Sequence, residues 1–255
     1  MKPFVSILLL CCAVCCKTPD RDELIVQSPV LAGILVGGEH PKDIRFFELP
    51  HSDTDAIIPR NATISISSEN AEVESLNLEG GVYATQEGYL LQHDSVYKLT
   101  VVDLATTHTL SAETRIPPAI LSTFLTDDTV HISSPENFAG VLQWTSLDDS
   151  KYSYVVKLEN VEDMKVEIPI EGGQFSSRFS GPQLESQLIL QKTDFQFFGR
   201  HLLRVYAIDR EFESVFFFDA ADFRGFLRNG PDNVNGGKGF VSGVSTFSVE
   251  IFIEN

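Results

Sequence analysis

The chain has 255 residues, of which 43% are hydrophobic, and a formal net charge of −17 at pH 7. A chain of this length buries a sizeable core and forms one or two domains. The negative charge argues against nucleic acid as a partner, because phosphate binding needs clustered Lys and Arg. The cysteines all lie within residues 11–16, so the rest of the chain has no disulfide, no Cys-based metal site and no cysteine nucleophile.

Residues 1–16 are typical of a secretory signal peptide. Lys2 supplies the positive charge at the start, and the apolar stretch after it ends at Lys17. This stretch contains about 12 apolar residues, fewer than the roughly 20 that a membrane-spanning helix needs. We therefore expect an exported protein without a membrane-spanning helix.

The cysteines at the end of this leader resemble a bacterial lipoprotein signal, in which a cysteine after the apolar stretch carries the lipid. We predict Cys16 as the lipidated residue, with Cys15 as the alternative. Two or three acyl chains anchor a protein firmly, since each buried CH₂ contributes about 0.8 kcal/mol. Residues 17–23 then form an acidic tether, which is either a surface-export signal or a solvated linker. The predicted location is the outer membrane, on the cell surface or the periplasmic face.

From residue 24 onward the apolar residues recur with a period of two, which predicts half-buried antiparallel strands. No regular alternation of strands with long helices occurs, so the fold class is mostly β. The first predicted module, residues 24–116, is an immunoglobulin-like β-sandwich. Its strands are expected near residues 24–36, 43–49, 61–67, 71–78, 82–85, 88–103 and 107–115.

A module boundary is expected at Ile116-Pro117-Pro118, because two prolines cannot join a strand ladder. The second predicted module, residues 117–255, is fibronectin type III-like. Trp144 lies in one of its strands and is expected to be a core anchor rather than a ligand platform. The expected strands are near residues 119–124, 129–133, 140–144, 152–159, 187–191, 202–209 and 247–253.

One segment of the second module breaks the period of two. Phe212, Phe216, Ala220 and Phe223 recur at helical spacing, and Gly225 follows them. This pattern predicts a short helix, although a strand around residues 215–218 remains an alternative because Val and Phe favour sheets.

A glycine-rich segment, Asn235-Gly236-Gly237-Lys238-Gly239, precedes the last predicted strand. It does not match a phosphate-binding loop, because Ser or Thr does not follow the Lys and the next segment is strand-like. We interpret Gly236, Gly237 and Gly239 as a structural turn that needs positive φ or a close backbone approach.

Phenylalanine is concentrated near the C-terminus, in residues 195–252. Core packing is the simplest explanation. The alternative is an exposed aromatic patch that contacts a partner, for which Phe198 and Phe217 are the candidate residues.

Taken in order along the chain, these features resemble the DUF4249 family of Bacteroidota lipoproteins. The resemblance rests on the leader followed by an ordered series of segments: 24–26, 62–66, 81–83, 116–117, 142–144, 152–156, 203–212 and 235–240. It covers about residues 22–253 and depends on the order of motifs that are individually weak. It implies an envelope lipoprotein that assists nutrient capture beside a TonB-dependent transporter, and it supplies no catalytic residue.

The sequence shows no pattern of a catalytic, metal or cofactor site. The six histidines occur singly, no Gly-x-Ser-x-Gly elbow occurs, and no acidic run matches a calcium loop. We therefore expect no enzymatic activity, no cofactor and no bound metal. The leading hypothesis is a non-enzymatic binding or accessory subunit. The alternatives are a structural or adhesive surface protein, and an envelope glycan hydrolase with paired carboxylates.

Overall fold

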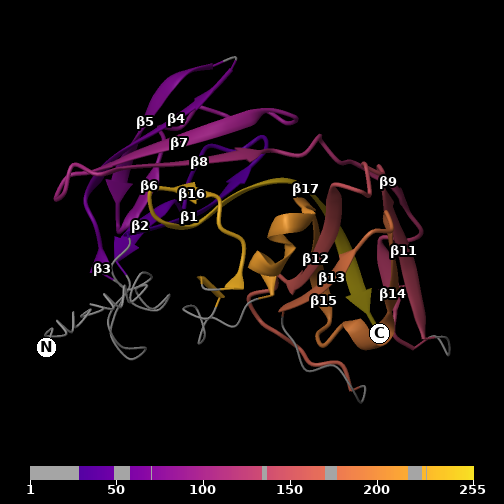
Figure 1. Ribbon diagram of the computed structural model, residues 1–255. Coiled ribbons are helices and arrows are strands. Elements are labelled where there is room, and N and C mark those ends of the chain that lie inside the picture. The colour runs from indigo at the N-terminus through magenta and orange to yellow at the C-terminus, as the bar shows by residue number, and fades with distance from the viewer. Residues whose placement is uncertain are drawn as a thin grey trace, which may run out of the picture.

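The computed structural model describes residues 29–48, 58–69, 71–133, 137–169, 177–217, 226–227 and 229–255. Within these residues the protein is mostly β, and its strands form sheets of eight, six and three strands that pack as two β-sandwich modules (Figure 1). This confirms the fold class expected from the period of two. No helix among the described residues is long and apolar enough to cross a membrane.

The first sandwich pairs a six-stranded sheet with part of an eight-stranded sheet. The eight-stranded sheet contributes β1 (Pro29–Val36), β2 (Arg45–Glu48), β3 (Ile58–Pro59) and the first part of β17 (Lys238–Glu254). The order in the six-stranded sheet is β16-β8-β7-β4-β5-β6. Its members are β4 (Ala62–Ser68), β5 (Ala71–Glu79), β6 (Val82–Ala84), β7 (Val96–Asp103), β8 (Thr109–Arg115) and β16 (Val234–Asn235).

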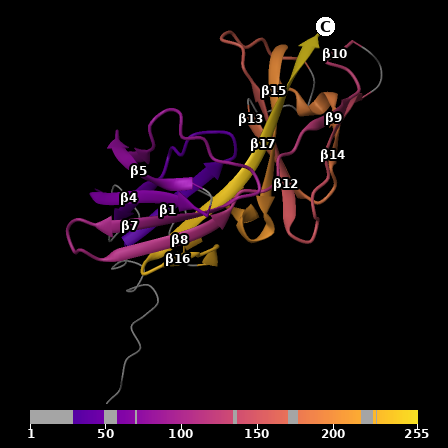
Figure 2. The ribbon, with the colours of Figure 1, turned by 90° about the horizontal axis from the view of Figure 1, so that it is seen from above.

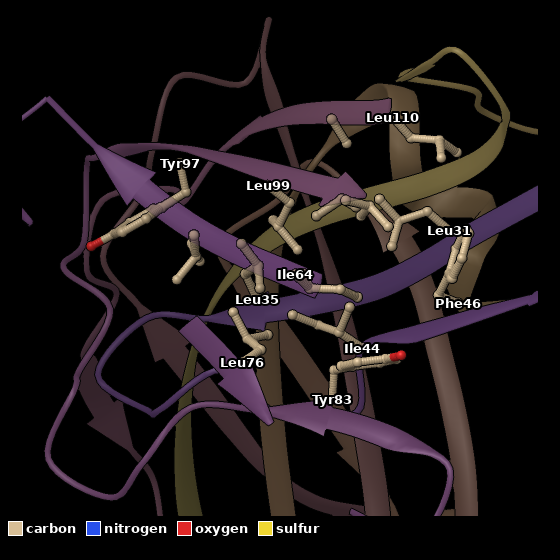
Figure 3. Close-up of a cluster of buried hydrophobic side chains, with 14 of the residues drawn as sticks. Leu31, Leu35, Ile44, Phe46, Ile64, Leu76, Tyr83, Tyr97, Leu99 and Leu110 are labelled. Atoms are coloured by element: carbon tan, nitrogen blue, oxygen red, sulfur yellow. The ribbon is translucent and has the colours of Figure 1, made fainter. Parts of the chain in front are cut away.

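Apolar side chains on alternate positions of both sheets meet in the first core (Figure 3). Leu31 of β1, Ile64 of β4 and Leu99 of β7 are fully buried there. Two tyrosines also lie in this core, and their hydroxyl groups are satisfied: the Tyr83 hydroxyl donates to the Arg60 carbonyl, and the Gln92 N–H donates to the Tyr97 hydroxyl. These two buried hydroxyl groups therefore cost little, because each has a partner.

The second sandwich pairs the remaining strands of the eight-stranded sheet with a three-stranded sheet. The former are β12 (Tyr152–Asn160), β13 (Ser177–Gln183), β15 (Gly199–Asp209) and the second part of β17, with β10 (Thr129–His131) also pairing β17. The latter are β9 (Ser122–Leu125), β11 (Phe138–Trp144) and β14 (Gln187–Gln191), which the short 3₁₀ helix η1 (Lys192–Asp194) follows.

Trp144 is buried in the second core, as the sequence predicts. Its ring packs edge-on against Tyr154 of the facing sheet, with the ring centroids 5.3 Å apart. Such aromatic pairs contribute about 0.5–1.5 kcal/mol beyond the area they bury.

The last strand, β17, belongs to both sandwiches. Residues Val30–Val36 of β1 pair in parallel with Lys238–Val244, and Gly199–Ile208 of β15 pair antiparallel with Val244–Ile253. Figure 2 shows β17 crossing from one module to the other. The predicted division at residue 116 thus separates most strands of the two modules, but the C-terminal segment completes both.

A third apolar cluster fills the angle between the two modules. Val30 and Phe47 contribute from the first module, Val155 and Ile208 from the second, and Phe240 from β17. Phe212 and Val215 of the 3₁₀ helix η2 (Arg210–Phe216) complete the cluster. The modules are therefore joined by a hydrophobic core as well as by a shared strand.

The helix expected around Phe212 is present over its first part, as the 3₁₀ helix η2. Its N-cap is Asp209, whose side chain accepts a hydrogen bond from the Glu211 N–H. Because a 3₁₀ helix has three residues per turn, it buries Phe212 and Val215, whereas the predicted spacing of four pairs Phe212 with Phe216. Ala220, Phe223 and Gly225 lie outside the described residues.

Three strands were not expected from the sequence: β3, β13 and β16. β13 contains Gly181 and Pro182, which are typical of loops, but it is an edge strand, where Pro is tolerated. β3 and β16 have two residues each, too few to show a period.

Candidate functional site

The outer face of β1 is apolar, although its inner face already packs into the first core. Leu31 and Leu35 point inward. Ala32 points outward and is buried in the third cluster, whereas Ile34 and Val36 on the same outer face are only half-buried. These two side chains line the floor of a groove.

The groove has a volume of about 680 Å³, within the range of roughly 300–1,000 Å³ that is usual for ligand pockets. Phe47 of β2, Pro59 of β3 and Phe240 of β17 line its apolar part. Its rim includes the β5–β6 turn, in which Gly80 and Gly81 both adopt positive φ, at 58° and 90°. Two glycines suit this tight hairpin turn, since both central positions need positive φ.

Basic side chains lie on the same rim. Lys42 forms an ion pair with Glu39, at 2.6 Å between Nζ and Oε2, and Asp43 is the carboxylate that lines the groove. Arg45 lies opposite Ala32 in the strand register and makes no ion pair or side-chain hydrogen bond in the part of the chain that the structure describes. An uncompensated guanidinium beside an apolar floor suits a ligand with an apolar body and an anionic group.

The sequence analysis did not single out these groove residues. The run Pro29–Val36 is nearly all apolar, which is typical of a strand buried on both faces, and this signal could have pointed to a second covered surface. Nothing in the sequence indicated that part of that surface is left open beside Arg45.

Asp103 and His201, two buried ionisable groups elsewhere in the described chain, have structural partners. Asp103, at the β7–β8 turn, accepts hydrogen bonds from the Thr106 hydroxyl at 2.7 Å and the Ala105 N–H at 3.0 Å. Its carboxylate also pairs with Arg60 at 2.6 Å. Burial alone would raise the pKa of Asp103, but these hydrogen bonds and the Arg60 charge outweigh it and lower the pKa below its ordinary value.

His201 is buried in β15 as a neutral side chain. Its Nδ1 lies 3.1 Å from the Gly199 carbonyl and its Nε2 lies 3.3 Å from Nδ2 of Asn160, so Nδ1 donates and Nε2 accepts. Burial lowers the pKa of His201, although the Gly199 carbonyl and the Glu162 charge act in the opposite direction. This histidine therefore supports the fold, since both of its nitrogens are already engaged.

One Ser–His contact occurs at the junction of the modules. Nδ1 of His93 lies 2.8 Å from Oγ of Ser245. The Ser245 hydroxyl donates to the Pro117 carbonyl and its side chain is fully buried. Since its proton is already committed, this pair links the connecting segment to β17 and does not form an activated nucleophile. No group of three or more His, Cys, Asp or Glu that could hold a metal ion occurs among the described residues.

The two phenylalanines predicted as partner contacts lie in different surroundings. Phe198 is half-buried and packs against the second core. Phe217 follows η2 and is 40% exposed. Whether either ring contacts a partner stays a prediction, as does lipidation, because Cys15 and Cys16 lie outside the described residues.

The three turn glycines lie where β16 leads into β17. Gly236 has φ of 82° and Gly239 has φ of 121°, a region that favours glycine. A Cβ on Gly237 would overlap the Leu110 side chain, and one on Gly239 would overlap the Leu31 carbonyl oxygen. The close approach of the β1 and β17 backbones therefore depends on Gly239.

Among solved structures, the chain is similar to the FN1–FN3 domains of chicken CNTN1, with 10% identity and a TM-score of 0.24 over 88% of this chain. It spans 65% of that chain, less than two thirds of its length. It is also similar to the titin domains z1z2, crystallised in complex with telethonin, with 12% identity, a TM-score of 0.23, and coverage of 90% of this chain and 96% of that chain. These values carry no argument about function. No protein-family model and no curated protein matches the chain.

Proposed function

We propose that this protein is a non-enzymatic binding lipoprotein of the outer membrane, anchored through Cys16, that holds a ligand for a TonB-dependent transporter. The observation that carries the binding role is the groove on the outer face of β1, with its apolar floor and Arg45, which has no ion-pair partner within the described part of the chain. The lipid anchor and the transporter rest on the leader and on the resemblance to the DUF4249 lipoproteins, and the anchor faces either the cell surface or the periplasm.

The joined modules suit such a role. Because β17 and the third cluster connect the two sandwiches, the groove in the first module keeps a fixed position relative to the second. A subunit that hands a ligand to a transporter needs this rigidity, since preorganised surfaces lose less entropy on binding.

The binding role is tested with anilinonaphthalene sulfonate, a fluorescent probe with an apolar body and one anionic group. We expect Arg45→Gln to weaken binding about tenfold, as the loss of one charge-assisted contact implies. The matched control is Lys98→Gln, which removes an exposed cation on β7 of the opposite sheet and should leave affinity unchanged. Equal affinities of both variants and the unmodified protein would contradict the role of the groove.

The anchor and the partner need separate experiments. Radiolabelled palmitate should enter the intact chain and not Cys16→Ala, whereas loss only in Cys15→Ala would assign the lipid to the alternative cysteine. Incorporation of palmitate into the double variant Cys15→Ala, Cys16→Ala would contradict lipidation of these cysteines.

At native expression, a pull-down from outer membranes should recover a TonB-dependent transporter. Binding to a glycan panel without a transporter would instead favour the structural or adhesive role.

A further inference from the structure

The edge of β17 that faces away from β15 is covered at both ends and open in between. β1 covers residues 238–244 of this edge, and β10 covers residues 252–254. Among the described residues, no strand pairs with this edge over residues 245–251. Figure 2 shows β10 beside the C-terminal end of β17, beyond the part that β1 follows.

The direction of the main-chain groups in this gap follows from the hydrogen bonds at its two ends. On this edge the Val244 carbonyl accepts from the Gly37 N–H at 2.9 Å, and the Phe252 N–H donates to the Asp128 carbonyl at 2.7 Å. Main-chain groups alternate in direction along a strand, so those of Thr246, Ser248 and Glu250 point to the same edge. These three residues have no main-chain partner on this edge within the described chain.

The neighbouring strand supports this assignment. Arg200 lies opposite Phe252 in the β15–β17 register, and its carbonyl accepts from the Val161 N–H on the far side of β15. The pair Arg200–Phe252 is therefore a non-hydrogen-bonded pair, and so is every second pair along the ladder. Within residues 245–251, the odd-numbered residues therefore bond to β15, and the even-numbered ones have no main-chain partner among the described residues.

The open segment is held in an extended conformation. Phe247, Val249 and Ile251 point into or against the second core, and β15 pairs with every residue of the segment. Ser248 and Glu250 are exposed. A rigid, exposed strand edge with successive unpaired N–H and C=O groups is a ready template for another strand.

We propose that this edge binds a short extended peptide segment of a partner protein, which adds to the sheet as a strand. The main chain of the peptide would pair with Thr246, Ser248 and Glu250, as in other recognition by strand addition. Exposed acidic groups at Glu250 and Asp128 favour basic side chains on the peptide. This inference concerns a surface of the second module and does not depend on the ligand of the groove.

The covered ends exclude a second copy of β17 as the occupant. In an antiparallel pair centred on Ser248, residue 252 of one strand would lie opposite residue 244 of the other. At that point β10 already covers the first strand and β1 of the other copy covers the second, so both would occupy the same space. A peptide whose ends turn away from the sheet avoids this clash, and the gap of seven residues spans roughly 23 Å.

The first test is amide hydrogen exchange of the full chain, followed residue by residue by NMR. We expect the amides of Thr246, Ser248 and Glu250 to exchange at least about tenfold faster than those of Phe247 and Val249, which bond to β15. Equal protection of the two sets would mean that the edge is already paired, and would overturn the proposal.

The second test adds a synthetic peptide of alternating Thr and Lys. Binding should slow exchange at the three edge amides and leave those of Phe247 and Val249 unchanged. The control peptide has the same side chains but carries N-methyl groups on every second amide, which removes the main-chain donors. The proposal is wrong if neither peptide binds, if both bind equally, or if the edge amides do not slow.

Discussion

The two halves of β17 are one continuous strand in two different environments. In residues 238–244 nearly every side chain is buried, because the first core covers one face and the third cluster covers the other. In residues 247–252 half-buried or buried positions alternate with exposed ones, because only the inner face meets a core. The sequence of β17 is therefore rich in glycine and apolar residues in its first half, whereas apolar and polar residues alternate in its second half.

The edges of the two halves differ as well. In the first half, side chains close the edge opposite β1: the Val241 N–H donates to Oδ1 of Asn233 at 2.9 Å, and the Gly243 N–H donates to Oγ1 of Thr114 at 2.8 Å. In the second half, no strand among the described residues pairs with the edge opposite β15 between residues 245 and 251. The first half is thus a structural joint, whereas the second half has main-chain groups available for a partner.

The largest loss of stability is expected from a substitution in the first half of β17. Gly239→Val should destabilise the protein by about 4 kcal/mol, because the residue has φ of 121° and its Cβ would overlap the Leu31 carbonyl. Gly88→Val is the matched control: Gly88 has φ of 111°, and no atom lies within 4 Å of its Cβ position. Urea denaturation should show a much smaller loss for Gly88→Val; similar losses would mean that backbone strain alone, and not the close approach of β1, explains the need for Gly239.

The second prediction concerns the third apolar cluster, which packs on the first half of β17. Phe212→Ala removes a buried ring from the third cluster and should cost about 3 kcal/mol. Because this cluster joins the modules, thermal unfolding should also become less cooperative. The comparison is Phe252→Ala in the second half, whose ring is 41% exposed and which should cost less than about 1 kcal/mol. Equal costs would contradict the difference between the halves.

A change of pH should have a smaller effect on stability, through a histidine that lies beside the second half of β17. His201 lies opposite Ile251, and its pKa is lowered by burial. Below about pH 6.5 the unfolded chain binds a proton that the folded chain resists, so stability falls as the pH drops from 6.5 toward the folded pKa. The slope from this group is at most about 1.4 kcal/mol per pH unit. Melting temperatures between pH 7.5 and 5 should show it.

The variant His201→Gln isolates this pH effect, because it removes the buried imidazole. Its pH slope should be smaller than that of the unmodified protein. An unaltered slope in His201→Gln would show that other groups are responsible.

Asp103, whose pKa is also lowered, acts in a different pH range. Its stabilising effect is present above its ordinary pKa near 4 and is lost as the pH falls through the folded pKa.

Much of the strand arrangement was predictable because period two is a local property. Residues 62–67, 97–101 and 152–158 alternate clearly and are strands. Trp144 was predictable as a core residue, since a large ring on an apolar strand face gains most by burial. The segment at Phe212 was predictable as helical, but its 3₁₀ form was not. The surface that a helix packs against decides whether its buried residues recur every three or every four positions.

The candidate site was far less accessible to sequence reasoning. Ile34 looks like any apolar strand residue and Arg45 like any surface cation, and they share a groove only because β1, β2 and β17 pair in one sheet. For the concentration of phenylalanine near the C-terminus, the sequence favoured core packing, with an exposed contact patch as the alternative. In the structure Phe212 and Phe240 are buried in the third cluster, so much of that signal reflects the joint between the modules.

The sequence by itself determined most of the strand segments and which of their faces are apolar, since both are encoded in neighbouring residues. The leader with its cysteines stays a prediction. Only the tertiary structure decided that β17 is shared by two sandwiches and that the outer face of β1 is half covered. It also decided that no described strand pairs with one edge of residues 245–251. These features depend on pairing between segments about 200 residues apart, Val30–Val36 with Lys238–Val244, and no local period specifies such a partner.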